Sequence, residues 1–202
     1  MRIDELIAAV QGTLGLRVDG KAGPQTWGAI YDRIVDPRAA GSASTSAIAP
    51  VDASSETVIA TLLPGVRPMA RTLVQKAAQG GIRIKVISGL RSYQEQDALY
   101  AFGRTTPGEI VTNARAGHSH HNFGTAFDVG VFEGNRYLAA SPKYRAVGVL
   151  GVDLGLEWGG NWKDFVDQPH FQLRPDWARD MSDREMLVAL RERVADGLPI
   201  YA

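Results

Sequence analysis

The chain has 202 residues, of which 45% are apolar, and its formal net charge is zero. This length is enough for one or two domains with a sizeable core. The balanced charge gives no electrostatic reason to expect a nucleic-acid partner. The chain contains no cysteine, which excludes disulfides and thiolate metal sites. Any metal site must therefore be built from histidine, aspartate, glutamate and water.

The first 35 residues predict a small helical unit. Apolar side chains recur at helical spacing near the start, at Ile3, Leu6, Ile7 and Val10. Pro24 fits the first turn of a second helix, which would continue through Trp27, Ile30 and Ile34. The stretch VQGTLGLRVDGKAGPQTWGAI resembles the motif half of a three-helix peptidoglycan-binding module. The resemblance implies a wall-binding module at residues 1–35; the alternative is a helical hairpin packed on the main domain.

Residues 36–55 differ in composition from the segments on either side. Their sequence, DPRAAGSASTSAIAPVDASS, is rich in alanine, serine and proline and holds few large apolar side chains. Such a segment buries too little apolar surface to offset the entropy of ordering it. We therefore expect a flexible linker between the N-terminal unit and a domain that spans residues 56–202.

The pattern from residue 56 onward predicts an α+β domain, with a small antiparallel sheet flanked by helices. We expect helices at residues 68–78, 92–102, 141–155 and from 182 onward, where Ser182 and Glu185 form a capping box. We expect strands at residues 82–88, 125–132 and 170–173. In the second strand, alternation directs Phe127, Val129 and Val131 into the core. Asp128 then lies on the opposite face, between Ala126 and Gly130, where a ligand could approach.

Three of the four histidines fall in the stretch HSHHNFGTAFD, residues 118–128. The stretch could hold a three-histidine metal site, one ligand with two bystanders, or an ordinary polar loop. The fourth histidine, His170, follows Pro169, and a proline disfavours helix at the residue before it. We therefore expect a turn that delivers His170 into a strand.

His121, Asp128 and His170 would supply the three protein ligands that catalytic zinc usually takes. Zinc lowers the pKa of a coordinated water to about 7, and a carboxylate that is not a ligand is then needed to accept its proton. Asp167, three residues before His170, is the candidate for this general base. Asp128 alone could equally be a solvated strand acid, and Glu157 is the nearest alternative base in the sequence.

Two motifs together resemble a known family. SHHNFGTAFD matches Ser-x-His-x-x-Gly-x-Ala-x-Asp, and DQPH matches acid-x-x-His. SGLRSYQEQDALY and WGGNWKDFVDQPHFQ also look like blocks of this family. Residues 60–175 are thus similar to the zinc peptidases of bacterial cell walls, which include D-Ala-D-Ala carboxypeptidases and phage L-alanyl-D-glutamate endopeptidases.

The resemblance implies roles for single residues. It makes His121, Asp128 and His170 the ligands of one zinc ion and Asp167 the general base. Many members carry glutamate at the base position, but endopeptidase-like members use aspartate, so we expect Asp167 to be active. The family also implies that Arg91 binds a substrate carboxylate or stabilises the oxyanion, which agrees with the positive charge of arginine. Ser119 is implied to hydrogen-bond the substrate.

Other residues near these motifs have more ordinary interpretations. Arg91 could instead form a structural ion pair, and Gln96 could help to order the helix that follows it. We expect Trp158 and Trp162 to pack rather than to line a groove. We expect His118 and His120 to be polar loop residues, although His118 could contact substrate.

The implied function is that of an endolysin-like zinc peptidase that cleaves the L-Ala–D-Glu bond of the peptidoglycan stem. The alternatives are a D-Ala-D-Ala carboxypeptidase and a non-catalytic wall-binding protein with structural zinc. We expect a monomer whose partner is bacterial peptidoglycan, without nucleic acid or a membrane span. The N-terminus lacks a basic region followed by an apolar run. We therefore expect synthesis in the host cytoplasm of a bacteriophage, without a signal peptide, and holin-dependent release to the wall.

Overall fold

The computed structural model describes residues 2–23, 26–27, 30 and 48–201 and divides into two compact units, residues 1–47 and 48–202. The first unit contains helix α1 (Ile3–Thr13), where the apolar spacing predicted it. The buried amide of Gln11 organises the turn after α1. Its oxygen accepts from the backbone N–H groups of Asp19 and Gly20, and its nitrogen donates to Asp19 Oδ1 at 2.8 Å. The predicted helix from Pro24 to Ile34 lies largely outside the described residues.

The second unit begins at Ile48, so the predicted linker boundary at residue 55 is too late. Helix α3 (Ala53–Ile59) starts inside that segment. The Asp52 carboxylate accepts from the Ser55 backbone N–H at 3.1 Å and so caps the helix. Val51 packs against the main core, and Ile59 is fully buried in it. The N-cap and these core contacts therefore stabilise the helix, although its first residues have the polar, alanine-rich composition of a linker.

The remaining helices are those that the sequence predicts, within two residues at most ends. They are α4 (Arg67–Gln79), α5 (Tyr93–Ala101), α6 (Lys143–Asp153) and α7 (Asp183–Ala195). The predicted capping box of Ser182 and Glu185 is present at the start of α7. Residues 48–201 also contain three short 3-10 helices: η2 (His120–Phe123), η3 (Gly159–Asn161) and η4 (Asp176–Ala178).

One antiparallel sheet lies at the centre of the domain. Its strands are β1 (Ile84–Ser88), β2 (Ala126–Glu133), β3 (Arg136–Leu138), β4 (Glu157–Trp158) and β5 (His170–Gln172). Their order is β1-β2-β5-β4, with β3 paired to β2. The short strands β3 and β4 were not predicted. The register sets Asp128 opposite His170 on β5 and opposite Ser88 on β1, which brings together side chains from three strands.

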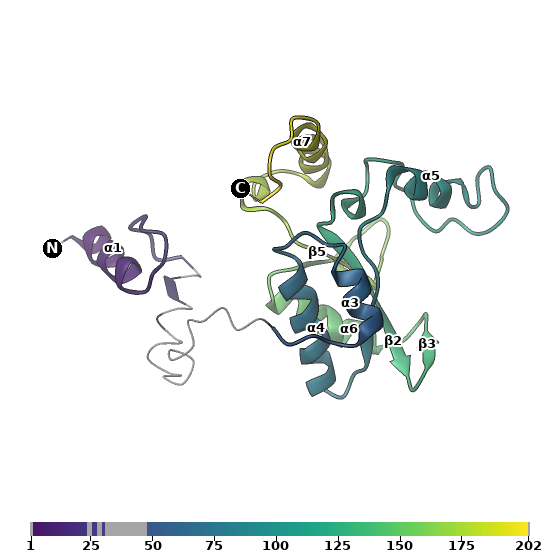
Figure 1. Ribbon diagram of the computed structural model, residues 1–202, viewed down its shortest axis with the longest axis horizontal. Coiled ribbons are helices and arrows are strands. Elements are labelled where there is room, and N and C mark those ends of the chain that lie inside the picture. Colours follow the sequence, from purple (N-terminus) through teal and green to yellow (C-terminus); the bar gives the residue numbers. More distant parts are fainter. Residues whose placement is uncertain (1, 24–25, 28–29, 31–47, 202) are drawn as a thin grey trace. The chain divides into compact units, whose positions relative to one another are not determined.

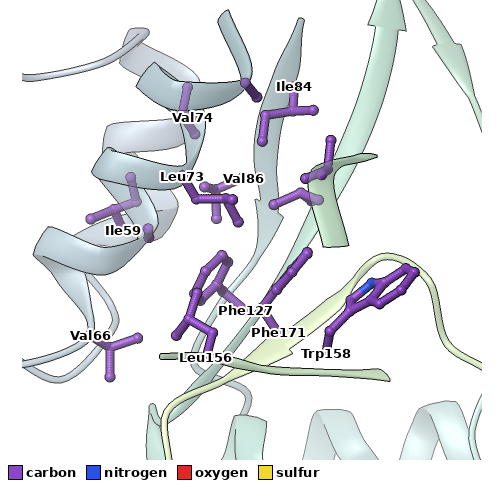
Figure 2. Packing of buried hydrophobic residues seen from close by; sticks show 14 of the residues in the cluster. Ile59, Val66, Leu73, Val74, Ile84, Val86, Phe127, Leu156, Trp158 and Phe171 are labelled. Atoms are coloured by element: carbon purple, nitrogen blue, oxygen red, sulfur yellow. The ribbon is translucent and has the colours of Figure 1, made fainter. Parts of the chain in front are cut away.

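Helices α3, α4 and α6 gather against the sheet (Figure 1) and enclose the main core with it. Phe127, Val129 and Val131 are fully buried in this core, as the alternation of β2 predicted. The rings of Phe127 and Phe171 stack at 5.8 Å between centroids, and both point into the cluster shown in Figure 2. The core therefore occupies one face of β2 and leaves the Asp128 face available for a site.

Helix α6 approaches the sheet closely because it carries two glycines. A Cβ atom at Gly148 would overlap the indole of Trp158, and one at Gly151 would overlap the ring of Phe171. Trp158 is 9% exposed and packs in the core, which confirms the prediction for this residue. Within the described part of the chain, no helix is both long and apolar enough to cross a bilayer.

Candidate metal centre and active-site cleft

Three side chains from separate segments converge on one point. His121 comes from η2, Asp128 from β2 and His170 from β5. Asp128 Oδ1 lies 3.2 Å from His121 Nε2 and 3.2 Å from His170 Nδ1, and the two ring nitrogens are 3.3 Å apart. All three potential ligand atoms lie within 4.8 Å of one another. The structure thus brings together the three residues that the sequence motifs singled out.

Local backbone geometry explains how His121 reaches this point. The Ser119 hydroxyl accepts from the His121 backbone N–H at 3.3 Å and starts the η2 turn. Gly124 ends that turn with φ of +67°, a left-handed conformation that glycine adopts readily. The chain then enters β2, whose pairing with β5 places Asp128 beside His170. Ser119 therefore has a structural role here, and its contact with substrate stays a prediction.

Each histidine ring is held from outside the cluster by a second hydrogen bond. His121 Nδ1 lies 2.8 Å from the carbonyl oxygen of Gly89, so this nitrogen carries the proton and Nε2 is free to bind a cation. His170 Nε2 lies 3.0 Å from Gln172 Oε1, which leaves Nδ1 directed into the cluster. Both rings are buried. The inner nitrogens, His121 Nε2 and His170 Nδ1, therefore face Asp128.

The cluster is negatively charged at its centre. Burial disfavours the ionised form of Asp128, but the charges and hydrogen bonds of His121 and His170 hold the pKa of its carboxyl well below the usual value. Burial likewise disfavours a charged His170, yet Asp128 raises the pKa of that ring above its usual value. A carboxylate between two imidazoles thus favours a positive charge at this position.

Arg91 is fixed beside the cluster rather than free in solution. Its Nη2 lies 3.7 Å from Asp128 Oδ2 and donates to Ser88 Oγ at 3.0 Å, and its Nη1 donates to Gln96 Oε1 at 2.8 Å. Gln96 is fully buried and also donates to the Ala114 carbonyl at 2.7 Å. Gln96 thus orients the Arg91 guanidinium directly. The sequence had predicted only that Gln96 helps to order the helix that follows Arg91. Arg91 does form the ion pair that was considered as its structural role, but its partner is Asp128, a residue of the cluster.

Asp167 lies at the turn that leads into β5. Its backbone N–H donates to the Gly159 carbonyl at 3.0 Å, and its carbonyl accepts from the His170 N–H at 3.2 Å. Within the described residues its carboxylate makes no hydrogen bond to another side chain. Burial and then the charge of Asp128 raise the pKa of Asp167. Asp167 therefore offers an uncommitted carboxylate beside the cluster.

The candidate metal ligands line one cleft of about 480 Å³ together with Arg91 and Asp167. Its lining includes Arg91, Ser119, His121, Asp128, Asp167 and His170. Residues 111–114, Trp162 and Phe165 also line the cleft. Trp162 is 37% exposed and its ring lies 4.9 Å from that of His170. The prediction that Trp162 only packs is therefore wrong, because it packs on His170 and also lines the cleft.

Comparison with known proteins identifies the family. The family model described as D-alanyl-D-alanine carboxypeptidase matches residues 112–173, the segment that holds His121, Asp128, Asp167 and His170. Over 127 residues the chain is 39% identical to the peptidoglycan L-alanyl-D-glutamate endopeptidase CwlK of Bacillus subtilis. This match covers 57% of the chain and 75% of CwlK. The chain belongs to the M15 family of zinc peptidases.

Two further M15-type relatives are more distant. The chain is 27% identical over 115 residues to an L-alanyl-D-glutamate peptidase of Listeria phage A118, which covers 55% of the chain and 38% of the phage protein. The crystal structure of the L-Ala D-Glu endopeptidase ChiX of Serratia marcescens aligns with a TM-score of 0.49 and 24% identity, over 66% of the chain and 96% of ChiX. The match to CwlK confirms, at the level of the family, the resemblance stated from the motifs.

The residues of this M15 peptidase fit a zinc ion. Two imidazole nitrogens and one carboxylate oxygen form the donor set of catalytic zinc sites with three protein ligands. The hydrogen bonds to Gly89 and Gln172 supply the outer contacts that orient such histidines. The predicted cofactor therefore agrees with the family and with the chemistry of the cluster. The assignment of each ligand and of Asp167 remains a proposal.

The two other histidines of HSHHNFGTAFD differ from each other in the M15 peptidase. His118 is exposed and lines the cleft, as a loop residue that could meet substrate. His120 was expected to be a polar loop residue, and this is wrong: it is 6% exposed, and its Nε2 lies 2.8 Å from Asp183 Oδ1. The partner, on α7, is 63 residues away in the sequence, and no local pattern indicated the pair.

Sequence reasoning also missed Gln172 and the true position of Glu157. Gln172 follows His170 by two residues in β5, so the period of a strand could have placed both side chains on one face. Glu157 was considered as an alternative base. In the structure it pairs with Arg174 and accepts from Gln172 Nε2 at 2.6 Å, so its carboxylate is already engaged.

Proposed function

We propose that this M15 peptidase hydrolyses the L-Ala–D-Glu bond of the peptidoglycan stem in the cleft around His121, Asp128 and His170. One observation supports this most: a histidine, aspartate, histidine cluster and the uncommitted carboxylate of Asp167 line the same cleft. The choice of bond is supported by the names of two curated relatives, both L-alanyl-D-glutamate peptidases. The substrate partner is then bacterial peptidoglycan.

Each residue has a defined task in this reaction. His121 Nε2, Asp128 and His170 Nδ1 would hold the zinc ion, which supplies Lewis-acid activation of water and of the scissile carbonyl. Asp167 accepts the proton of the attacking water and delivers it to the leaving amine, since none of the described side chains hydrogen-bonds its carboxylate. The Arg91 guanidinium, held by Ser88 and Gln96, stabilises the oxyanion or binds a substrate carboxylate.

The test is digestion of purified sacculi followed by mass spectrometry of the products. We expect wild-type protein to create new amino termini on D-Glu, and Asp167→Asn to reduce the rate by at least about 100-fold, since a general base contributes that much. The asparagine variant keeps the shape of the side chain, so its zinc content should equal that of the wild type. New reducing sugar ends without new amino termini would contradict the proposal.

A second candidate is a D-Ala-D-Ala carboxypeptidase, since the family model that matches residues 112–173 carries that description. This activity would use the same residues to hydrolyse a different bond, the one between the two terminal D-Ala residues. Incubation with a soluble pentapeptide stem separates the two, because the carboxypeptidase releases free D-Ala and the endopeptidase does not. A non-catalytic wall-binding protein with structural zinc would give neither product.

We also propose that residues 1–35 bind peptidoglycan and that residues 36–47 link them to the enzyme. The motif in residues 10–30 and the turn held by Gln11 support this. The full-length Asp167→Asn protein should co-sediment with sacculi without digesting them. Adding Gln11→Leu should weaken this binding because the turn after α1 loses its hydrogen bonds. Equal binding of both proteins would contradict a role for the N-terminal unit.

The cellular route is the last part of the proposal. We propose that the protein acts as a monomer on the wall after holin-dependent release from the cytoplasm. Light scattering should give the mass of one chain. Expression in a host should cause lysis only when a holin is expressed with it, and lysis without a holin would contradict this route.

A further inference from the structure

Gln172 connects the candidate metal centre to two acidic residues. It is 1% exposed, and its Oε1 lies 3.0 Å from His170 Nε2. On the other side, its Nε2 donates to Glu157 Oε2 at 2.6 Å and lies 3.4 Å from Asp183 Oδ1. The amide therefore stands between one imidazole and two carboxylates.

The two carboxylates determine which way the amide faces. An ionised carboxylate only accepts hydrogen bonds, so the NH2 group of Gln172 must point toward Glu157 and Asp183. Arg174 donates to both oxygens of Glu157 through its Nε and Nη2 atoms, so both oxygens act as acceptors. Burial disfavours ionisation of Asp183, but the hydrogen bond from His120 lowers the pKa of its carboxyl overall. A reversed amide would place its oxygen against two negative groups.

The orientation of the amide then fixes the proton on His170. With its nitrogen directed at the acids, Gln172 presents only its oxygen to the ring, and an amide oxygen only accepts. His170 Nε2 must therefore carry a proton, whatever the state of Nδ1. The Nδ1 atom, which faces Asp128 and His121, is then the ring atom left for a cation.

We propose that Glu157 and Asp183 set the tautomer of His170 through the amide of Gln172, and that this presents Nδ1 to zinc. The inference rests on the proposed zinc centre and adds Gln172, Glu157 and Asp183 to it as positioning residues. It also excludes Glu157 as the general base, since both of its oxygens are already hydrogen-bonded.

The two histidines differ in what fixes them. The outer nitrogen of His121 meets a backbone carbonyl, that of Gly89, which no side-chain substitution removes. The outer nitrogen of His170 meets a side chain, that of Gln172. Substitution of Gln172 should therefore affect His170 alone, which allows a selective test.

The tautomer can be measured directly by ¹⁵N NMR of the histidine rings in the full-length, metal-free protein, at a pH where His170 is neutral. We expect a protonated Nε2 for His170 in the wild type, hydrogen-bonded to Gln172. An unprotonated Nε2 would overturn the inference whatever the effect of any variant. In Gln172→Leu, Nε2 loses its acceptor, and we expect the two tautomers to mix.

Zinc affinity, measured by competition with a chelator of known affinity, provides the second test. Loss of such an outer partner typically weakens metal binding by about 10–100-fold, and we expect this range for Gln172→Leu. The control is Gln11→Leu, another buried glutamine, whose amide contacts Asp19, Gly20 and Thr26 in the N-terminal unit rather than a histidine. We expect its zinc affinity to change by less than about threefold. Equal losses in both variants, or none in Gln172→Leu, would overturn the inference.

A second pair of variants covers the case in which Gln172→Leu does not fold. Glu157→Gln keeps an oxygen that can accept from Gln172, and we expect zinc affinity close to that of the wild type. Glu157→Leu removes the acceptor and should weaken zinc binding. Equal affinities in this pair would contradict the role of Glu157. A wild-type protein that binds no zinc would refute the proposed function instead, while the metal-free tautomer would still decide this inference.

Discussion

His120 Nε2 lies 2.8 Å from Asp183 Oδ1, and this contact joins the η2 turn to the first turn of α7. His120 is buried, whereas Asp183 is about half exposed at the start of its helix. The neighbouring residue His121 is a candidate metal ligand. The C-terminal helix is therefore attached directly to the loop that carries the site.

We predict that Asp183→Ala lowers the free energy of unfolding by about 1–2 kcal/mol. The buried His120 ring loses its hydrogen-bond partner, and α7 loses an acidic residue from its first turn, where the helix dipole favours negative charge. Urea unfolding would measure the change. The exposed Asp180, just before α7, provides the control, since Asp180→Ala should change stability by less than about 0.5 kcal/mol. Equal losses in both variants would contradict this account.

Glu56 and Arg71 join α3 to α4, and we predict that their contribution to stability depends on pH. Arg71 donates to both Glu56 oxygens, at 2.9 Å and 2.7 Å, and this hydrogen bonding lowers the pKa of Glu56 despite partial burial. Because the pKa is lower in the folded state, the ionised carboxylate stabilises the fold above the unfolded pKa of about 4.3. This contribution disappears as the pH falls through the folded value.

The Glu56→Gln variant should therefore be less stable than the wild type by about 1 kcal/mol at neutral pH, a typical value for a partly exposed pair. The difference should shrink as the pH drops below about 4. Thermal unfolding of both proteins across this pH range would measure it. A difference that stays constant from neutral to acidic pH would show that the charge of Glu56 does not contribute.

Gly148 and Gly151 make the approach of α6 to the sheet possible, and we predict that alanine at either position destabilises the protein. Alanine favours a helix over glycine by about 1 kcal/mol. Its Cβ would nevertheless overlap Trp158 or Phe171, and overpacking of a core costs about 1–3 kcal/mol. Val149→Ala, at an exposed position of the same helix, should have little effect. A rise in melting temperature for Gly148→Ala would show that the core relaxes around the methyl group.

Local patterns in the sequence predicted much of the fold and of the site. The alternation of β2 directed Phe127 to the core and Asp128 to the open face, and the capping box of Ser182 marked the start of α7. The motifs around His121 and His170 singled out the residues that now converge. These signals are local, so they do not depend on contacts with distant parts of the chain.

What the sequence could not predict depends on pairs that are distant along the chain. The burial of His120 is decided by Asp183, and the orientation of Gln172 by Glu157 and Asp183. The first three residues of helix α3, 53–55, were interpreted as linker because they are small and polar, while the attachment of the helix comes from Arg71 and the core. The two-residue strand β4 exists only because β5 lies beside it. None of these follows from composition or periodicity.

Arg91 gives the last prediction, which concerns catalysis. Its guanidinium is held by two acceptors at once, Gln96 and Ser88, while Nη2 lies 3.7 Å from Asp128. Lysine has a single nitrogen and cannot keep this orientation. We predict that Arg91→Lys lowers kcat by about 100–1000-fold, the range observed when an oxyanion donor is removed. The measurement is steady-state hydrolysis of a soluble muropeptide, with zinc content determined on the same samples.

The control is Arg83→Lys, which replaces an exposed arginine before β1 and should retain full activity. The position of Arg91 beside a candidate metal ligand favours an effect on kcat over one on KM. An unchanged kcat with a raised KM would assign Arg91 to a substrate carboxylate instead.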